Sequence, residues 1–134
     1  MRLVGVDFGA RRIGIAMGET EVKIATARPP MIASGKLATD AQNLVNFMRE
    51  EQAAAIVLGV PEHEDDERMA KICRRLGDEM VNLGAVVHFV DESFTSVEAE
   101  SALKTTNLTA AGRRKLRDGE AACQILERYF ERIQ

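Results

Sequence analysis

The sequence predicts an α/β fold whose sheet begins with three antiparallel strands and continues with parallel ones. Three strand-like segments follow one another at the N-terminus and are joined by short turns. After them, helix-like segments alternate with short, continuous apolar runs, which are typical of strands buried on both faces of a sheet. This order of elements predicts a five-stranded mixed sheet with helices on both faces.

The three N-terminal strands are predicted from apolar runs that glycines interrupt. We expect them at Leu3–Asp7, Ile13–Gly18 and Val22–Met31. The turns between them are expected at Gly9 and Gly18, because glycine adopts turn conformations without a steric cost.

The next segments alternate between helical and strand patterns. A helix is predicted to begin at Thr39, because Thr39-Asp40-Ala41-Gln42 resembles a capping box. An apolar strand at 53–60 then stops at Pro61. A second helix is predicted from an apolar stripe at helical spacing, formed by Met69, Ile72, Cys73, Leu76 and Met80. Gly84 leads into an apolar strand at 85–90, which ends at Asp91-Glu92.

Two further helices complete the pattern. A second capping box, Thr95-Ser96-Val97-Glu98, predicts the start of one of them. The last helix is expected from about Leu116 to Ile133. Its apolar positions are Ala121, Ala122, Ile125, Leu126, Tyr129, Phe130 and Ile133.

Composition and charge limit the classes of protein to consider. The chain has 134 residues, of which 46% are hydrophobic and 29% charged, and this predicts one globular domain spanning residues 1–134. The formal net charge of -3 provides no global basic field, so a polyanion would need a local patch or a metal. Neither a signal peptide nor an apolar run of bilayer length is present, which favours a cytoplasmic protein with no membrane partner. Cys73 and Cys123 form no closely spaced motif and are expected to be buried apolar residues.

Carboxylates at three places are candidates for one site. Asp7 lies inside an apolar strand, where an ionised group is costly to bury without compensation. Asp91-Glu92 follows a strand, at the end where ligands of open α/β sheets collect. Asp118 precedes Ala121 and Ala122 by three and four residues, so it is expected on the core-facing side of its helix. The alternatives are solvated loop acids for Asp91-Glu92 and, for Asp118, a favourable charge in a first helical turn.

Clustered carboxylates repel one another unless a cation neutralises them. Ligation by oxygen alone suits Mg²⁺ or Mn²⁺, and neither His63 nor His88 is placed for a zinc site. Two such ions can bridge a scissile phosphate, activate water and stabilise the leaving oxygen. The acids therefore indicate chemistry on a phosphoester.

Basic residues adjoin two of these acids. Arg11 and Arg12 follow Asp7, while Arg114 and Lys115 belong to a basic run directly before Asp118. We expect these four basic residues to hold backbone phosphates, although such runs are also common on solvated faces. Gly9, without a Cβ, would let the backbone approach a substrate, and its alternative role is a simple turn. The acidic segment 62–67 is expected to repel nucleic acid.

Four motifs resemble the YqgF/RuvX family of ribonuclease H-like proteins. They are Asp7-x-Gly9-x-x-Arg12-Ile13-Gly14-Ile15-Ala16, then Ile56-Val57-Leu58-Gly59-Val60-Pro61, then Asp91-Glu92-Ser93-Phe94-Thr95-Ser96-Val97-Glu98-Ala99-Glu100, and Asp118-x-x-Ala121-Ala122-x-x-Ile125-Leu126. The resemblance implies a ribonuclease H-like fold and a metal-dependent nuclease whose acidic triad is Asp7, Glu92 and Asp118. Members of this family are associated with trimming the 5′ end of the precursor of 16S rRNA, and were also proposed as Holliday junction resolvases.

The chain departs from the family pattern at two places. Ser93 stands where the family usually has arginine, and an acidic 62–66 segment stands where it usually has a neutral loop. Both changes reduce the positive or neutral character of the presumed substrate face. They therefore bear on substrate affinity and choice.

Three hypotheses follow for the function. The first is a metal-dependent nuclease that acts on structured RNA in ribosome maturation. The second takes branched DNA as the substrate, and because a resolvase makes two coordinated cuts it requires a homodimer rather than a monomer. The third is a nucleic-acid-binding assembly factor with weak or lost catalysis. A phosphotransferase of the actin–sugar kinase type also opens with Asp-x-Gly, but it needs two such domains.

Overall fold

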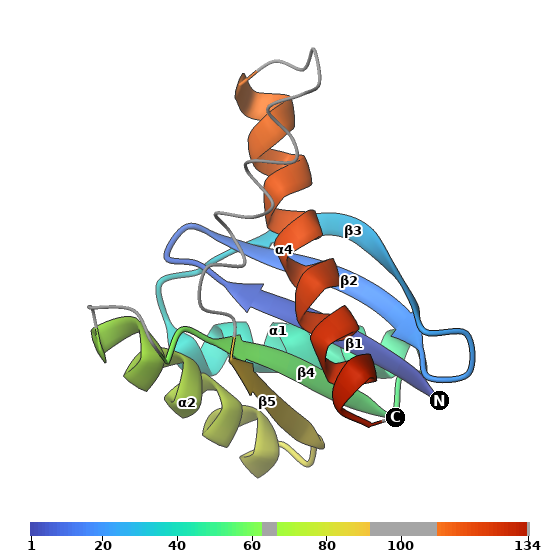
Figure 1. The fold of residues 1–134 in the computed structure, drawn as a ribbon. Helices are drawn as coiled ribbons and strands as arrows, with labels where there is room; N and C mark the ends of the chain where they lie inside the picture. Colours follow the sequence, from blue (N-terminus) through green and yellow to red (C-terminus); the bar gives the residue numbers. More distant parts are fainter. Residues whose placement is uncertain (63–66, 92–109, 134) are drawn as a thin grey trace.

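The computed structural model describes residues 1–62, 67–91 and 110–133, and within the last range it describes side chains from Gly119 onward. These residues form a five-stranded mixed sheet with helices on both faces (Figure 1). The strands are β1 (Arg2–Phe8), β2 (Arg12–Glu19), β3 (Ile24–Ile32), β4 (Ala55–Val60) and β5 (Val87–Asp91). The helices are α1 (Leu37–Glu50), α2 (Glu67–Asn82) and α4 (Ala110–Arg132).

The strand order is β3-β2-β1-β4-β5. β1 pairs antiparallel with β2, and β2 with β3, whereas β1–β4 and β4–β5 are parallel. The prediction of three antiparallel strands followed by parallel ones is confirmed. β4 lies between β1 and β5 and is buried at every position, as its uninterrupted apolar run predicts.

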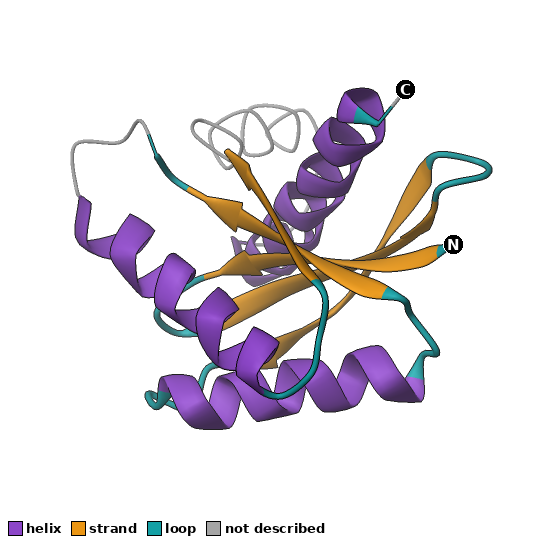
Figure 2. Cartoon of the chain, turned by 90° about the horizontal axis from the view of Figure 1, so that it is seen from below, coloured by secondary structure: helices purple, strands orange, loops and turns teal. Residues whose placement is uncertain are grey.

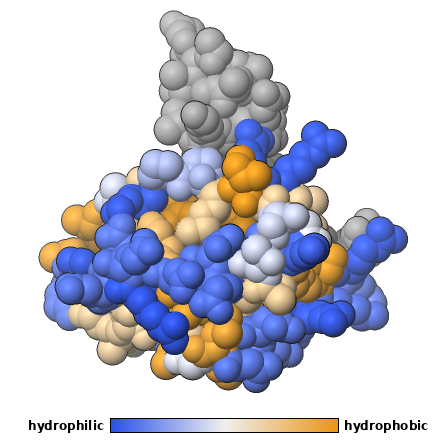
Figure 3. Space-filling view, turned by 180° about the vertical axis from the view of Figure 1, so that it is seen from behind, coloured by the Kyte–Doolittle hydropathy of each residue, from blue (hydrophilic) through white to orange (hydrophobic). Residues whose placement is uncertain are grey.

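The helices form two layers around the sheet. Helices α1 and α2 cover one face and α4 covers the other, as Figure 2 shows. Alternating residues of β1 supply the two cores: Val4 and Val6 pack with α1 and α2, whereas Leu3 packs with α4. Seen from the side opposite α4, the surface is largely hydrophilic, with separate small apolar areas (Figure 3).

Small residues let α4 lie unusually close to the sheet. A Cβ on Gly5 of β1 would meet Leu126 Cγ at 2.6 Å and the carbonyl oxygen of Ala122 at 2.8 Å. A Cβ on Gly119 of the helix would lie 2.8 Å from Ala27 Cβ on β3. The helix backbone therefore rests directly on the strands, with no side-chain layer between them at these points.

Three of the expected boundaries are wrong in the first part of the chain. Gly18 lies within β2, and the chain turns at 20–23, where Lys23 has a positive φ of 56°, so β3 begins at Ile24 rather than at Val22. A Cβ on Gly18 would lie 2.9 Å from Phe130 of α4, so this glycine serves packing rather than a turn. Helix α1 begins at Leu37 with no side-chain cap, two residues before the predicted start. The Asp40 carboxylate is buried and accepts a hydrogen bond from the Ser34 backbone N–H at 2.9 Å.

The later helices match the predictions in part. The stripe predicted for the second helix is confirmed, since Cys73, Leu76 and Met80 of α2 are buried. Helix α4 begins at Ala110, six residues before the expected start, because the intervening alanines, lysine and arginines are good helix formers. Its predicted apolar stripe is buried as far as Phe130, apart from the half-buried Tyr129, whereas Ile133 is exposed. The helix predicted to begin at Thr95 lies outside the described residues. No described helix combines the length and the apolar character that crossing a bilayer requires.

Candidate functional site

The candidate site lies at one edge of the sheet. β1, β4 and β5 are parallel, so their carboxyl ends meet at the same edge. Asp7 is the next-to-last residue of β1, and Asp91 is the last residue of β5. Because β4 lies between these strands, the two acids are two strands apart, and by the strand registers Asp91 lies one residue beyond the level of Asp7.

The pleat separates Asp7 and Asp91 onto opposite faces. Leu3 packs with α4 and Gly5 contacts it, so the period of two along β1 places half-buried Asp7 on the α4 face. On β5, Val90 packs with the α4 core, which places Asp91 on the α2 face. This placement argues against Asp91 as the partner of Asp7. Glu92 itself lies outside the described residues.

The turn from β1 to β2 holds the basic residues that follow Asp7. The backbone N–H of Gly9 donates to the carbonyl oxygen of Arg12 at 3.1 Å. A Cβ on Gly9 would lie 2.6 Å from that oxygen, so the turn by itself requires a glycine. Arg11 is exposed, and its carbonyl accepts from the Ala33 N–H at 2.9 Å, while Arg12 is half-buried. The structure thus keeps both arginines at the edge where β1 ends.

The remaining predicted site residues belong to α4. Arg114, Lys115 and Asp118 all lie within this helix, and their side chains are outside what the structure describes. The contact between Gly119 and Ala27 places this part of the helix over β3. Asp7 and this turn of α4 therefore lie on the same side of the sheet.

The donors at this edge suit a hard divalent cation. Asp7 supplies carboxylate oxygens, the ligands that Mg²⁺ and Mn²⁺ prefer. Softer donors are engaged elsewhere: the His88 ring stacks on Tyr129 at 5.0 Å, and burial raises the pKa of the Cys123 thiol to about 12. Among the side chains that the structure describes, no three acidic, histidine or cysteine residues cluster, and this set includes only Asp7 of the predicted triad.

Two arginines of α4, which the sequence analysis does not identify, hold the strand that leads to the site. Arg128 Nη1 donates to the carbonyl oxygen of Asp91 at 2.7 Å, and Arg132 Nη1 donates to that of Phe89 at 3.1 Å. Their spacing of four residues puts them on one face of the helix. In the sequence this spacing is also common on exposed helix surfaces, so it offers no specific signal.

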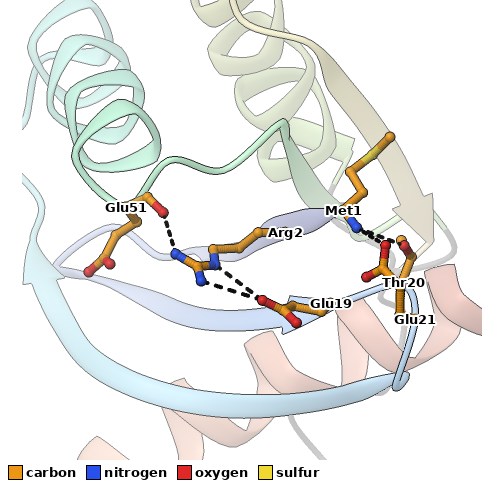
Figure 4. Close-up of polar contacts among 6 residues, drawn as sticks. All are labelled: Met1, Arg2, Glu19, Thr20, Glu21 and Glu51. Carbon is orange, nitrogen blue, oxygen red and sulfur yellow. Dashed lines mark hydrogen bonds and ion pairs between the residues drawn. The ribbon is translucent and has the colours of Figure 1, made fainter.

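A pocket of about 500 Å³ lies at the other end of the sheet, beside Arg2 at the start of β1 and Ile24 at the start of β3. Arg2 donates to the Glu51 carbonyl oxygen at 2.8 Å and contacts Glu19 (Figure 4). Arg28 pairs with the Glu51 carboxylate. The charged side chains at this pocket thus pair with one another, and none of the described site residues predicted from the sequence lines it.

Comparison with known families and curated proteins shows one consistent match. The RuvX family, described as "Holliday junction resolvase", matches residues 1–132. The "Putative pre-16S rRNA nuclease" of Opitutus terrae is 34% identical over 137 residues, covering 98% of this chain and 92% of the relative. The protein of the same description from Burkholderia ambifaria (strain MC40-6) is 31% identical over 134 residues, covering 98% and 89%.

Solved structures share the fold at low sequence identity. A structure described as "T. thermophilus RuvC in complex with Holliday junction substrate" has a TM-score of 0.60 at 13% identity and covers 99% of this chain and 95% of its own. The Fowlpox virus resolvase in complex with Holliday junction DNA has a TM-score of 0.59 at 12% identity and covers 99% of each chain. The ribonuclease H-like fold that the sequence motifs imply is confirmed, and these structures show that it is RuvC-like.

Proposed function

The chain belongs to the RuvX family, and on this premise we propose that it is a metal-dependent nuclease that processes the 5′ end of pre-16S rRNA. The observation that carries the proposal is the position of Asp7. Its carboxylate lies at the carboxyl end of β1, on the face that α4 covers, and two arginines follow it in the adjoining turn. An acid and cations at one sheet edge suit a phosphodiester held beside a divalent metal.

We assign the metal to Asp7, Glu92 and Asp118. Asp91 lies on the other face of the sheet, which favours Glu92 as the acid that follows β5. For Asp118, helix phase supports the assignment, because Ala122 and Ile125, four and seven residues later, are buried against the sheet. Bound Mg²⁺ or Mn²⁺ would supply Lewis acidity at the scissile phosphate and an activated water.

The protein's own contribution is to place the substrate. Arg11 and Arg12 in the β1–β2 turn, and Arg114 and Lys115 on α4, would contact backbone phosphates on either side of the carboxylates. Gly9 would let the turn approach the substrate backbone closely. In this proposal residues 1–134 form one nuclease domain that acts in the cytoplasm on structured RNA.

The family description favours a second substrate, a branched DNA junction. The same carboxylates would cut it, since RNA and DNA offer the metal the same phosphodiester. Resolution of a junction requires two coordinated cuts and therefore a homodimer, whereas trimming of an RNA end can be done by a monomer. The substrate test below therefore includes both nucleic acids.

The experiment compares wild type, Asp7→Asn and Asp91→Asn on a precursor 16S rRNA leader and on a four-way DNA junction, each with Mg²⁺ and with Mn²⁺. Asp91→Asn is the matched control, because it neutralises an acid at the same sheet edge on the opposite face. We expect Asp7→Asn to reduce RNA cleavage by at least about 100-fold, since it removes a metal ligand, and Asp91→Asn to cleave at nearly the wild-type rate.

Three results would contradict the proposal in different ways. Undiminished cleavage by Asp7→Asn would remove Asp7 from the site. Cleavage of the junction without cleavage of the leader would establish the DNA substrate instead. No cleavage of either, together with no Mn²⁺-dependent rise in melting temperature, would favour an assembly factor without catalysis, because a ligand that binds only the native state must stabilise it.

A further inference from the structure

Among the strands that the structure describes, β5 lies at the edge of the sheet, and alternate carbonyl groups of β5 face away from β4. The carbonyl oxygen of Val86 accepts from the Ile56 N–H at 2.9 Å and so faces β4. Because backbone groups alternate sides along a strand, the carbonyls of Phe89 and Asp91 face the open edge. These are the two carbonyls that receive hydrogen bonds from α4.

We call this pair of arginines, Arg128 and Arg132, the β5 clamp. Arg128 is half-buried and makes the shorter bond, 2.7 Å to Asp91. Arg132 is exposed, bonds Phe89 at 3.1 Å, and also lies over the Tyr129 ring at 5.4 Å. Both bonds join a cation to a backbone carbonyl, and such charge-assisted bonds are stronger than neutral ones.

Resting on the proposed function, we infer that Arg128 is a positioning residue for the metal site. It holds the backbone of Asp91, the residue directly before Glu92, against α4, the helix that also contains Asp118. One helix would thereby set the distance between two elements that each provide a proposed metal ligand. Bonds of this kind behind the ligands commonly change metal affinity by about 10- to 100-fold.

The clamp provides its own matched control. Arg132 donates to the same edge of the same strand, but its acceptor lies two residues, roughly 6–7 Å, farther from the proposed metal ligand. Arg132→Ala also removes the contact with the Tyr129 ring, and Arg128→Ala removes a half-buried side chain, so both substitutions lose packing as well as a hydrogen bond. If the two arginines only stabilise the fold, their substitutions should have similar effects on Mn²⁺ affinity. If Arg128 is a positioning residue, the two substitutions should differ in their effect on Mn²⁺ affinity.

The test uses the full chain with Arg128→Ala, Arg128→Lys and Arg132→Ala. The Mn²⁺ dissociation constant is measured by calorimetry, the urea midpoint by circular dichroism, and kcat and KM with the precursor rRNA leader. We expect both alanine variants to lower the urea midpoint by similar amounts. Arg128→Ala should weaken Mn²⁺ binding about tenfold and lower kcat with little change in KM, and Arg132→Ala should bind Mn²⁺ within about twofold of wild type.

Arg128→Lys keeps a cationic donor and should recover part of the Mn²⁺ affinity. This variant also keeps the inference testable if Arg128→Ala does not fold. The inference is overturned if both lysine and alanine variants at 128 bind Mn²⁺ like wild type, or if Arg132→Ala weakens binding equally. A rise in KM with unchanged Mn²⁺ affinity would make Arg128 a substrate contact and would likewise overturn it. Each of these results leaves the nuclease proposal intact, whereas a wild type that neither binds Mn²⁺ nor cleaves contradicts both.

Discussion

Replacing Gly5 with alanine should push α4 away from the sheet. The new Cβ would lie 2.6 Å from Leu126 Cγ and 2.8 Å from the Ala122 carbonyl oxygen, whereas ordinary van der Waals contact begins at 3.4 Å. The carbonyl belongs to the helix backbone, and Leu126 is fully buried, so neither atom can move aside alone. The whole helix must shift by about half an ångström in a close-packed interior.

Overpacking of this kind costs about 1–3 kcal/mol of stability. An alanine also restricts the unfolded chain more than glycine does, which offsets about 0.5–1 kcal/mol of that cost. We therefore expect Gly5→Ala to lower the free energy of unfolding by about 1–2 kcal/mol. With a urea m value of about 2 kcal/mol/M, the midpoint should fall by about 0.5–1 M.

Gly77→Ala is the control for this reasoning. A Cβ there would lie even closer to its neighbour, 2.4 Å from Phe89 Cζ. That atom, however, is the far end of a ring that is 36% exposed and can rotate toward solvent. Position 77 is also helical, where alanine is favoured over glycine by about 1 kcal/mol. We expect Gly77→Ala to unfold within about 1 kcal/mol of wild type.

Urea denaturation followed by circular dichroism measures both variants. The reasoning is refuted if Gly5→Ala is as stable as wild type, or if Gly77→Ala is the more destabilised of the two. The second result would mean that contact distance alone, rather than the ability of the neighbour to move, decides the cost.

Substitutions at two further residues test local electrostatics and a buried hydrogen bond. Burial and the neighbouring Glu120 and Glu131 raise the pKa of Glu127 in the folded protein. Above that pKa the charged carboxylate therefore lowers the stability of the fold. Once the carboxyl group is protonated in both the folded and the unfolded state, it no longer affects stability. Glu127→Gln should therefore raise the urea midpoint slightly at pH 7, and the difference should vanish below about pH 4; a difference that grew toward low pH would contradict this assignment. Asp40→Ala removes the buried acceptor of the Ser34 N–H and should cost about 1–3 kcal/mol in urea denaturation, whereas Asp40→Asn, which keeps an acceptor oxygen, should cost less. Equal stability of the alanine and asparagine variants would show that this hydrogen bond contributes nothing.

Much of the fold was predictable because burial on both faces leaves a local pattern. The continuous apolar run of β4 and the apolar stripe of α2 each indicate, from the order of the residues alone, which positions are buried. The capping box at Thr39 failed because Thr39 lies inside α1, which begins two residues earlier at Leu37 without a side-chain cap. The turn at Gly18 failed because a glycine needed for packing against α4 looks the same in a sequence as a glycine needed for a turn.

The candidate site was predictable to a smaller extent. Asp7 stands out because a charge within an apolar strand is unusual, and the family motifs point to Glu92 and Asp118. The clamp formed by Arg128 and Arg132 had no such signal, because its partners are backbone carbonyls, which every residue carries. The sequence shows which residues are arginines and can donate. Which backbone carbonyl groups are exposed to accept from them follows only from the position of β5 at the edge of the sheet.

The sequence by itself determined the class of fold, the family and the acids from which a metal site could be built. These properties depend on residue type and spacing, which local physical chemistry can interpret. Only the tertiary structure decided that Asp7 faces α4 while Asp91 faces α2, and that α4 rests on Gly5 and clamps the edge of β5. The physical reason is that a strand has two faces and a helix packs against only one, so which acids share a face depends on the packing of distant segments.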